Sequence, residues 1–452
     1  MNSRALYQLP CTTPGKEMAR AWQWQHATEG ILALVYVSDI AKWYPTSTTL
    51  TLLLLDVNTG KLLQSASWTL PLVVIETLRL ISDPLTATWM IGSLEWRSDG
   101  LYHIAVRTVA PGLPVTTLFD EQENDMTSLN PLYTMYAHER KCVVVYRKSA
   151  PYFHGNSTIY VGSIDLETKK EEHILVGSAD SAMVWTDERT ALVLALNPRT
   201  AGIWGFQLSR YDAAFHTKDW QQELYPRLTE TITPVLQGEN DFEWLGINAA
   251  MSPGPLLDER GEATWVVGAT LMDVFRFRGH GHTSTEASQL PRKVDMLIWL
   301  NAAGDELQRC SETIGLRVQM CRVQSTIVGV DLLNGRWRLW NWTPQQAASF
   351  QSVVWLDASL ASVHVLAEER GAGQVFWLIE EMREGVRISQ RDAHTLAEVV
   401  PGETLQGVQL LEPQNGSGAL DWYTEMDIAI YQGKLLLLGM NDSNQLVLYQ
   451  VG

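Results

Sequence analysis

Apolar residues are gathered in short runs along this chain rather than at helical spacing. The runs span about five to eight residues, as in CVVVY at 142–146 and ALVLAL at 191–196, and Gly, Asn, Asp or Pro residues separate them. Runs of this length that are rich in Val, Leu and Thr are typical of strands buried in a sheet. The pattern therefore predicts an all-β protein.

Two kinds of turn recur between the runs. A short acidic-basic turn, at 138–140 and again at 187–189, leads into a strand. A second turn follows the next strand and reads D-x-x-T-G-K at 56–61, with a matching copy at 165–170 and a weaker one at 392–395. In such a turn the Asp carboxylate accepts hydrogen bonds from backbone N–H groups two or three residues later, and Gly supplies the positive φ.

The strand that follows the first turn recurs roughly every 50 to 70 residues. Each copy is followed by a third strand and preceded by a shorter one, which predicts a unit of about 50 residues holding four antiparallel strands. The last unit, 426–451, supplies fewer strands, and we expect residues 5–9 to add the missing outer one. The expected second strands begin near Leu32, Thr88, Cys142, Ala191, Thr264, Thr326, Gln374 and Leu435.

The turns LLDVNTGKLL (54–63) and IDLETKKEEHIL (164–175) resemble the outer hairpin of quinoprotein-like and WD40-like β-propeller repeats. The resemblance is to the repeat class, not to a subfamily. It implies a single β-propeller over 1–452 with four-stranded blades and an N-terminal strand that closes the last blade. Eight blades are favoured and seven are the alternative. A pair of β-sandwiches joined by a linker is the other architecture, although no Pro/Gly/Ser-rich linker appears.

The chain departs from the quinoprotein pattern at two points. Gln64 stands where the quinoprotein repeat usually carries Trp, and no two Cys residues are adjacent. The resemblance therefore implies the scaffold without the quinone cofactor.

Charge and cysteine content indicate which classes of partner and which cellular compartment to expect. The 452 residues include 34 Lys and Arg against 51 Asp and Glu, a net charge of −17, which argues against electrostatic binding to nucleic acid or anionic membranes. The apolar runs are far shorter than the ~20 residues of a membrane span, and no secretory signal follows Arg4. Cys11, Cys142, Cys310 and Cys321 lack C-x-x-C spacing and are interpreted as free thiols in a reducing cytoplasm.

The sequence contains few recognisable catalytic or metal-binding motifs. The chain has neither a P-loop nor a G-x-S-x-G motif. His280 and His282, with Glu286 nearby, are the best metal candidates, but a zinc site needs three or four ligands and a surface loop is the simpler interpretation. We therefore assign no catalytic residue, no metal and no cofactor.

Several conspicuous residues are interpreted structurally. Trp337, Trp340 and Trp342 are expected to pack between blades, with Trp340 and Trp342 on one strand face and Trp337 on the other. An exposed aromatic patch for a partner protein is the alternative. His364 is expected to be a packed or edge residue. The acidic run at 120–125 (Asp120, Glu121, Glu123, Asp125) is interpreted as a solvated linker after a strand, with a docking site for a basic partner as the alternative.

Two stretches, about 211–255 and 271–293, do not follow the repeat and are interpreted as insertions. The second is locally basic and alternates aromatic with Arg side chains, a composition that suits a protein interface, and a disordered extension of a hairpin is the other interpretation. The candidate partner-binding residues are Phe275, Arg276, Phe277 and Arg278 in the second stretch, and Trp220 and Trp244 in the first.

These observations predict a non-enzymatic scaffold for protein–protein interaction in the cytoplasm. We expect a subunit of a bacterial multisubunit complex whose partners are other proteins, with a stress or defence complex as the narrower hypothesis. The alternative is a propeller enzyme or small-ligand binder, of lyase or hydrolase type, that uses the central channel.

Overall fold

The computed structural model describes residues 3–8, 22–26, 30–38, 47–83, 86, 88–123, 132–148, 158–178, 181–186, 189–197, 205–225, 227–231, 244–251, 256–257, 262–274, 292–367, 373–410, 428–443 and 445–452. In these residues every helix or strand assigned is a β-strand, and sheets of four antiparallel strands recur, so the all-β prediction is confirmed. No helix in them is long and apolar enough to cross a membrane.

The chain divides into two compact units, which are described separately. The first unit comprises Arg4–Gln221 and Leu437–Gln450, and the second comprises Gln222–Leu436 with Met1–Ser3 and Val451–Gly452.

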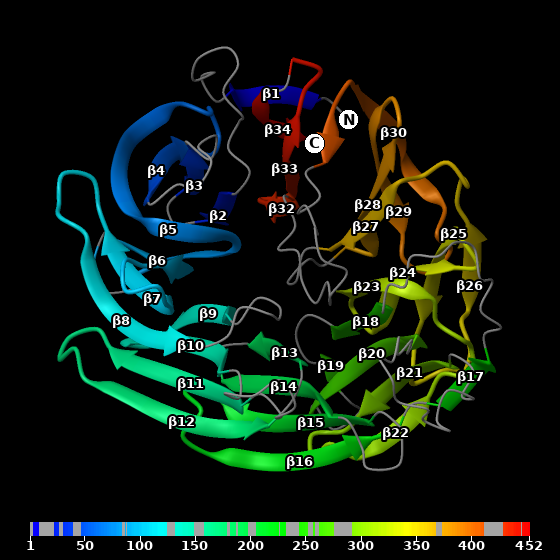
Figure 1. The fold of residues 1–452 in the computed structure, drawn as a ribbon. Helices are drawn as coiled ribbons and strands as arrows, with labels where there is room; N and C mark the ends of the chain where they lie inside the picture. Colours follow the sequence, from blue (N-terminus) through cyan, green and yellow to red (C-terminus); the bar gives the residue numbers. More distant parts are fainter. Residues whose placement is uncertain are drawn as a thin grey trace, which may run out of the picture. The chain divides into compact units, whose positions relative to one another are not determined.

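The sheets of the first unit are antiparallel meanders, in which strands consecutive in the chain are hydrogen-bonded neighbours (Figure 1). β5 belongs to two groups of four, because it pairs with β4 up to Pro71 and with β6 from Leu72 onward. The sheets are β2 (Trp22–His26), β3 (Ile31–Ser38), β4 (Ser47–Asp56), β5 (Leu62–Ser82), β6 (Trp89–Trp96), β7 (Tyr102–Val109) and β8 (Thr116–Glu123); β9 (Leu132–His138), β10 (Lys141–Lys148), β11 (Thr158–Asp165) and β12 (Glu171–Ser178); and β13 (Ser181–Thr186), β14 (Thr190–Asn197), β15 (Gly205–Asp212) and β16 (Lys218–Leu224).

The second unit repeats this arrangement with one variation. Its first sheet has the order β17-β21-β20-β18, with β19 beside β20 and β22 beside β21. The strands are β17 (Arg227–Thr231), β18 (Trp244–Met251), β19 (Leu256–Leu257), β20 (Ala263–Val274), β21 (Arg292–Leu300) and β22 (Glu306–Arg309); β23 (Leu316–Val323), β24 (Thr326–Leu333), β25 (Arg336–Trp342) and β26 (Ser352–Trp355); and β27 (Ser362–Leu366), β28 (Val375–Met382), β29 (Gly385–Asp392) and β30 (Glu398–Gln406).

The last sheet joins the two ends of the chain. The N-terminal strand β1 (Ser3–Gln8) is its edge and neighbours β34 (Leu446–Val451), which neighbours β33 (Lys434–Met440). The side chain of Arg4 donates from Nε and Nη2 to Oε1 of Gln450, at 3.0 and 2.7 Å. The expected N-terminal strand is therefore present beside the C-terminal one. Two short strands, β31 (Gln409–Leu410) and β32 (Ile428–Tyr431), are the other neighbours of β33.

The second strands of the expected repeat all exist. They are β3, β6, β10, β14, β20, β24, β28 and β33, and each begins within one residue of its expected position. The two expected insertions prove to contain strands. β16, β17 and β18 fall within 211–255, while β20 and β21 enter 271–293 from both ends and pair through Asp273 and Arg292.

The D-x-x-T turn has the expected hydrogen bonds. Oδ1 of Asp56 accepts from the backbone N–H of Asn58 at 3.1 Å, and from the N–H and hydroxyl of Thr59 at 2.7 and 2.8 Å. The corresponding bonds of Asp165 and Asp392 agree with these within 0.1 Å. Three carboxylates thus close the same turn by the same local chemistry.

The positive φ of this turn is supplied by Gly only in the first copy. Gly60 has φ 70°, whereas Lys169 and Leu396 occupy the same position with φ 60°. In the first copy an added Cβ would lie 2.0 Å from the backbone oxygen of Leu6 on β1. Glycine is therefore required where another strand approaches, and a side chain is accommodated elsewhere.

Apolar side chains between neighbouring sheets form the cores. In the second unit, Trp340 and Trp342 are fully buried with Val266 and Trp299 of the preceding sheet, while Trp337 is buried with Phe376 of the following sheet. The tryptophans of β25 thus lie on the two faces that strand alternation predicts, and packing between sheets is confirmed.

Candidate functional site

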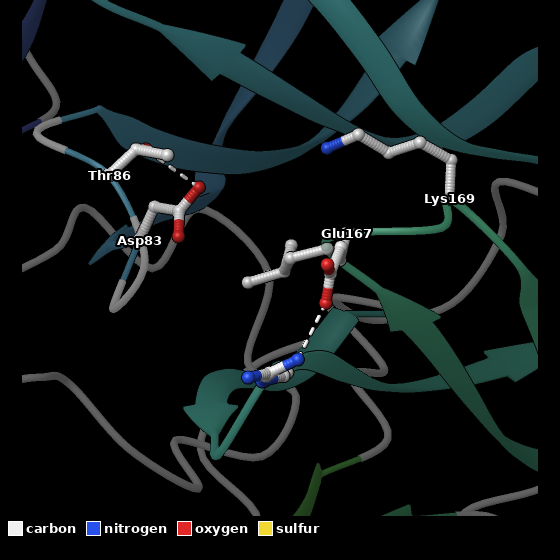
Figure 2. A pocket seen from close by; sticks show the side chains of 6 residues that line it. Asp83, Thr86, Glu167 and Lys169 are labelled. Atoms are coloured by element: carbon white, nitrogen blue, oxygen red, sulfur yellow. Dashed lines mark hydrogen bonds and ion pairs between the residues drawn. The ribbon is translucent and has the colours of Figure 1, made fainter.

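A pocket of about 380 Å³ opens in the first unit (Figure 2). Its lining comes from three connections between strands: β5 to β6, β9 to β10 and β11 to β12. The last two lie at the same end of the β9–β12 meander, so short turns place several polar side chains around one space. The lining residues are Asp83, Thr86, Arg140, Leu166, Glu167 and Lys169.

The D-x-x-T turn at 165–170 shapes one wall. The backbone N–H of Leu166 donates to the carbonyl of Arg140 at 2.8 Å, which joins the two turns of the meander. Leu166 is buried and gives the pocket an apolar floor. Hydrogen bonds from the backbone and hydroxyl of Thr168 lower the pKa of Asp165, so this carboxylate stays ionised and keeps the turn closed.

Lys169 is the cation that the turn directs into the pocket. Its left-handed backbone conformation, with the N–H donating to the carbonyl of Asp165 at 2.8 Å, projects the side chain across the opening toward Asp83 and Thr86 (Figure 2). Among the described residues no carboxylate forms an ion pair with its ammonium group. The ammonium group is therefore available to an anionic group of a ligand.

Asp83 is the buried acid of the pocket, at 7% exposure. Its Oδ2 accepts from the hydroxyls of Thr86 at 2.9 Å and Thr88 at 3.4 Å. Burial raises the pKa of the neighbouring Cys142 thiol to about 12, with a smaller contribution from the charge of Asp83. Cys142 is therefore a neutral core residue and does not act as a nucleophile for this pocket.

Arg140 and Glu167 form an exposed ion pair at the rim, with Nη1 of Arg140 2.6 Å from Oε2 of Glu167. The lining thus carries two cations and two anions. Among the described lining residues, the hydroxyl of Thr86 donates to Asp83, and no Ser, Cys or His is present. The chemistry of these residues suits reversible binding of a small group that carries both charges, and they offer no activated nucleophile.

A second cluster has metal-like geometry. The ligand atoms of Glu121, Glu171 and His173 lie within 4.8 Å of one another. Nε2 of His173 is 2.6 Å from Oε1 of Glu171, and its Nδ1 is 3.0 Å from the hydroxyl of Tyr146. The ammonium of Lys148 forms an ion pair with Glu121 and neutralises it. Because the protein's own cation compensates this cluster, we assign no metal to it.

Of the six candidate partner-binding residues, only Trp220 and Trp244 lie among the described residues. Trp220 lies partly buried on β16 in the first unit, and the backbone of Trp244 lies on β18 in the second. Phe275, Arg276, Phe277 and Arg278 lie outside the described residues, as do His280, His282 and Glu286.

The acidic run at 120–125 is not a linker where it is described, which corrects the sequence interpretation. Asp120 and Glu121 belong to strand β8. Asp120 accepts from Arg97 at 2.6 Å and lies 2.9 Å from Nδ1 of His103. β8 extends further than its apolar residues indicate. Its acidic side chains therefore lie within a strand, where they bind the side chains of other segments.

His364 is half-buried on the edge strand β27, in agreement with the expected packed or edge residue. It lies on β27 with Nδ1 3.1 Å from Nε2 of Gln319, and burial lowers its pKa to about 4.

Sequence inspection missed the pocket residues and the buried acid–Arg pairs. The pocket draws on turns far apart in the chain, so no local motif marks it. The pairs had a local signal: an acid and an Arg lie seven residues apart across a tight turn, as in Asp331–Arg338 and Glu380–Arg387.

Comparisons with known proteins give distant structural likenesses. No protein-family model matches this chain, and no curated protein matches it. The β-propeller domain of the Trilobed protease from Pyrococcus furiosus is 8% identical with a TM-score of 0.38, over 86% of this chain and 96% of that one. A eukaryotic initiation factor is 10% identical with a TM-score of 0.41, over 87% and 90%. The polysaccharide lyase Uly1 is 10% identical with a TM-score of 0.38, over 96% and 90%. The activities named for those proteins are not assigned to this chain.

Proposed function

We propose that this protein is a non-enzymatic scaffold for protein–protein interaction, built as a β-propeller of eight four-stranded blades. The count is supported by the described strands. Dividing β5 between β4 and β6, and counting β1 as the outer strand of the last sheet, makes eight groups. In this proposal the protein acts in the cytoplasm as a subunit of a bacterial multisubunit complex, with other proteins as its partners.

The observation that carries the proposal is the repeated exposure of large apolar side chains on outermost strands. Leu175 on β12, Trp355 on β26 and Val399 on β30 are 63%, 46% and 54% exposed. Single exposed apolar residues are ordinary, but here they recur on the outermost strands of three sheets. Binding of a partner protein would remove them from water.

The buried charges of the sheets support a structural rather than a catalytic role. Oε2 of Glu95 is 2.6 Å from Nη2 of Arg107, and Oδ2 of Asp331 is 2.6 Å from Nη2 of Arg338. A carboxylate held by a guanidinium in the neighbouring strand is not poised to exchange protons with a substrate.

The mixed-charge pocket favours a second candidate function, the binding of a small zwitterionic ligand. Lys169 would hold its anionic group, and Asp83 its cationic group. If this candidate function is correct, a small zwitterionic ligand should bind saturably to the wild-type protein and should not bind to the Lys169→Glu variant.

The scaffold is tested by purifying the tagged full chain from its own cells and measuring which proteins co-purify in fixed ratio. Val399→Glu places a charge on the apolar rim of β30 and should reduce at least one partner at least tenfold. Gln406→Glu is the matched control, because it adds the same charge at an exposed position of the same strand. A chain that is monomeric and free of partners in both forms would refute the scaffold.

A further inference from the structure

The edge strand β26, together with Arg336 at the start of the neighbouring strand β25, differs from the other outermost strands. We propose that β26 binds an extended peptide segment of a partner protein, which adds as a strand and carries a carboxylate. Arg336, Val353 and Trp355 are the side chains that contact it, and together they are named the docking edge. This inference rests on the scaffold function and specifies the chemistry of one partner site.

Outermost strands are normally protected from further pairing by charges, prolines or bulges. β8, β12, β16 and β22 each carry charged residues, and β30 carries Glu398, Pro401 and two register shifts against β29. Among the described outermost strands β8, β12, β16, β22, β26 and β30, β26 has the sequence SVVW, with neither charge nor proline. Its pairing with β25 is regular from Ser352 to Trp355.

The backbone of β26 offers hydrogen-bonding groups on its outer side. The N–H of Leu356 donates to the carbonyl of Trp337 on β25 at 3.0 Å. Because successive backbone amides of a strand point to opposite sides, those of Val353 and Trp355 point away from β25. An added strand would pair with the N–H and C=O groups of these two residues.

Trp355 is an exposed side chain that is nevertheless held in place. Its ring lies 5.4 Å from the guanidinium carbon of Arg336 and 5.9 Å from that of Arg338. Arg338 is itself immobilised, because it donates to both oxygens of the buried Asp331 and to the carbonyl of Thr313. A rigid Trp of this kind loses little conformational entropy when a partner covers it, which is the property of an interface anchor.

Arg336 supplies the charge complementarity. Its side chain is exposed, and among the described residues no carboxylate lies within ion-pair distance of it. The nearby Asp357 is engaged by Ser359, whose N–H and hydroxyl each donate to Oδ1 at 2.8 Å. A carboxylate on the incoming segment would pair with the guanidinium beside the Trp355 ring.

The short edge fits a peptide segment better than a second copy of the chain. Stable protein interfaces bury more than about 1,000 Å², which a four-residue strand does not provide. Two copies would also each bring a net charge of −17. A flexible segment needs only the edge, the Trp355 anchor and the Arg336 cation.

The test uses a phage-displayed library of random 12-residue peptides, selected on the full-length protein. We expect enriched peptides to carry Asp or Glu beside an apolar residue. A fluorescein-labelled enriched peptide is then titrated by fluorescence anisotropy. Val353→Pro removes one outward N–H without touching the β25 pairing, and it should weaken binding at least tenfold.

Arg336→Glu provides the charge test. Selection on this variant should enrich Lys- or Arg-bearing peptides, while Arg336→Lys should retain part of the acidic preference. Far-UV circular dichroism and the melting temperature confirm that each variant is folded. Failure to enrich peptides on the wild type, peptides without acidic residues, or unchanged binding to Val353→Pro would each overturn the inference.

Failure of this inference and failure of the scaffold function give different results. If partners still co-purify in fixed ratio while the edge binds no peptide, the scaffold stands and the docking edge is refuted. If no partner co-purifies with the wild type, the scaffold itself fails.

Discussion

Arg338 donates to both carboxylate oxygens of Asp331, from Nε at 3.0 Å and from Nη2 at 2.6 Å. The two residues lie directly opposite each other on β24 and β25, and Asp331 is fully buried. Its second oxygen also accepts the backbone N–H of Gly315 at 2.8 Å, so the pair fixes the connection that leads into β23. Glu380 and Arg387 occupy the same positions in the next sheet.

Replacing Asp331 by Asn should destabilise the fold by about 3 to 5 kcal/mol, because the buried guanidinium of Arg338 loses its counter-charge. Urea unfolding of the purified chain measures this change. Glu167→Gln removes an exposed ion pair and should cost at most about 1 kcal/mol. Equal effects of the two substitutions would contradict the assigned difference in burial.

Gly60→Ala should destabilise the protein by at least about 2 kcal/mol, because a left-handed φ and a Cβ 2.0 Å from the Leu6 oxygen are both unfavourable. Gly100→Ala is the matched control, since Gly100 has φ 80° and nothing within 4 Å of an added Cβ. Thermal unfolding should show a clearly smaller loss for the control. Similar losses would mean that β1 does not pack against this turn.

Lys169→Gly should leave stability unchanged or raise it by about 1 kcal/mol, because Gly adopts the left-handed conformation without steric cost. The same change removes the cation of the pocket. A chemical denaturation curve shifted to lower denaturant would indicate that the lysine side chain stabilises the turn.

His364 should make stability depend on pH between about 4 and 6.5. Its pKa is about 4 in the folded state against 6.5 when unfolded, so the unfolded chain binds more protons in this window. Stability therefore rises with pH across the window and is lost as pH falls, by about 3 kcal/mol in total. His364→Gln should flatten this part of the urea-midpoint profile, and a variant with the wild-type slope would disprove the assignment.

Cys142 and Cys321 should resist alkylation in the native state. Burial raises the pKa of both thiols, to about 12 for Cys142, so little thiolate exists at pH 8. In a Cys11→Ser background, mass spectrometry after iodoacetamide treatment should find both thiols unmodified, and modified once urea is added. Rapid native labelling would show that these sheets open.

The order of strands was predictable because its determinants are local. Each second strand is a short apolar run bounded by a turn, and the D-x-x-T carboxylate closes its turn with atoms at most three residues away. The same reasoning placed Trp337 opposite Trp340 and Trp342, since alternation along a strand needs no knowledge of the partner sheet. It failed for the acidic run of β8, where Arg97, just after β6, and Lys148, on β10 of another sheet, pair with Asp120 and Glu121 of the strand.

Sequence alone determined the all-β class, the period of the repeat, the closure of the turns and the presence of an N-terminal strand. Tertiary structure decided which of these elements have functional chemistry. Lys169 and Asp83 face one pocket, and Arg336 stacks on Trp355, because separate turns and strands converge in space. Backbone propensity acts between near neighbours in the chain, whereas a pocket or a docking edge depends on packing between segments that no local pattern connects.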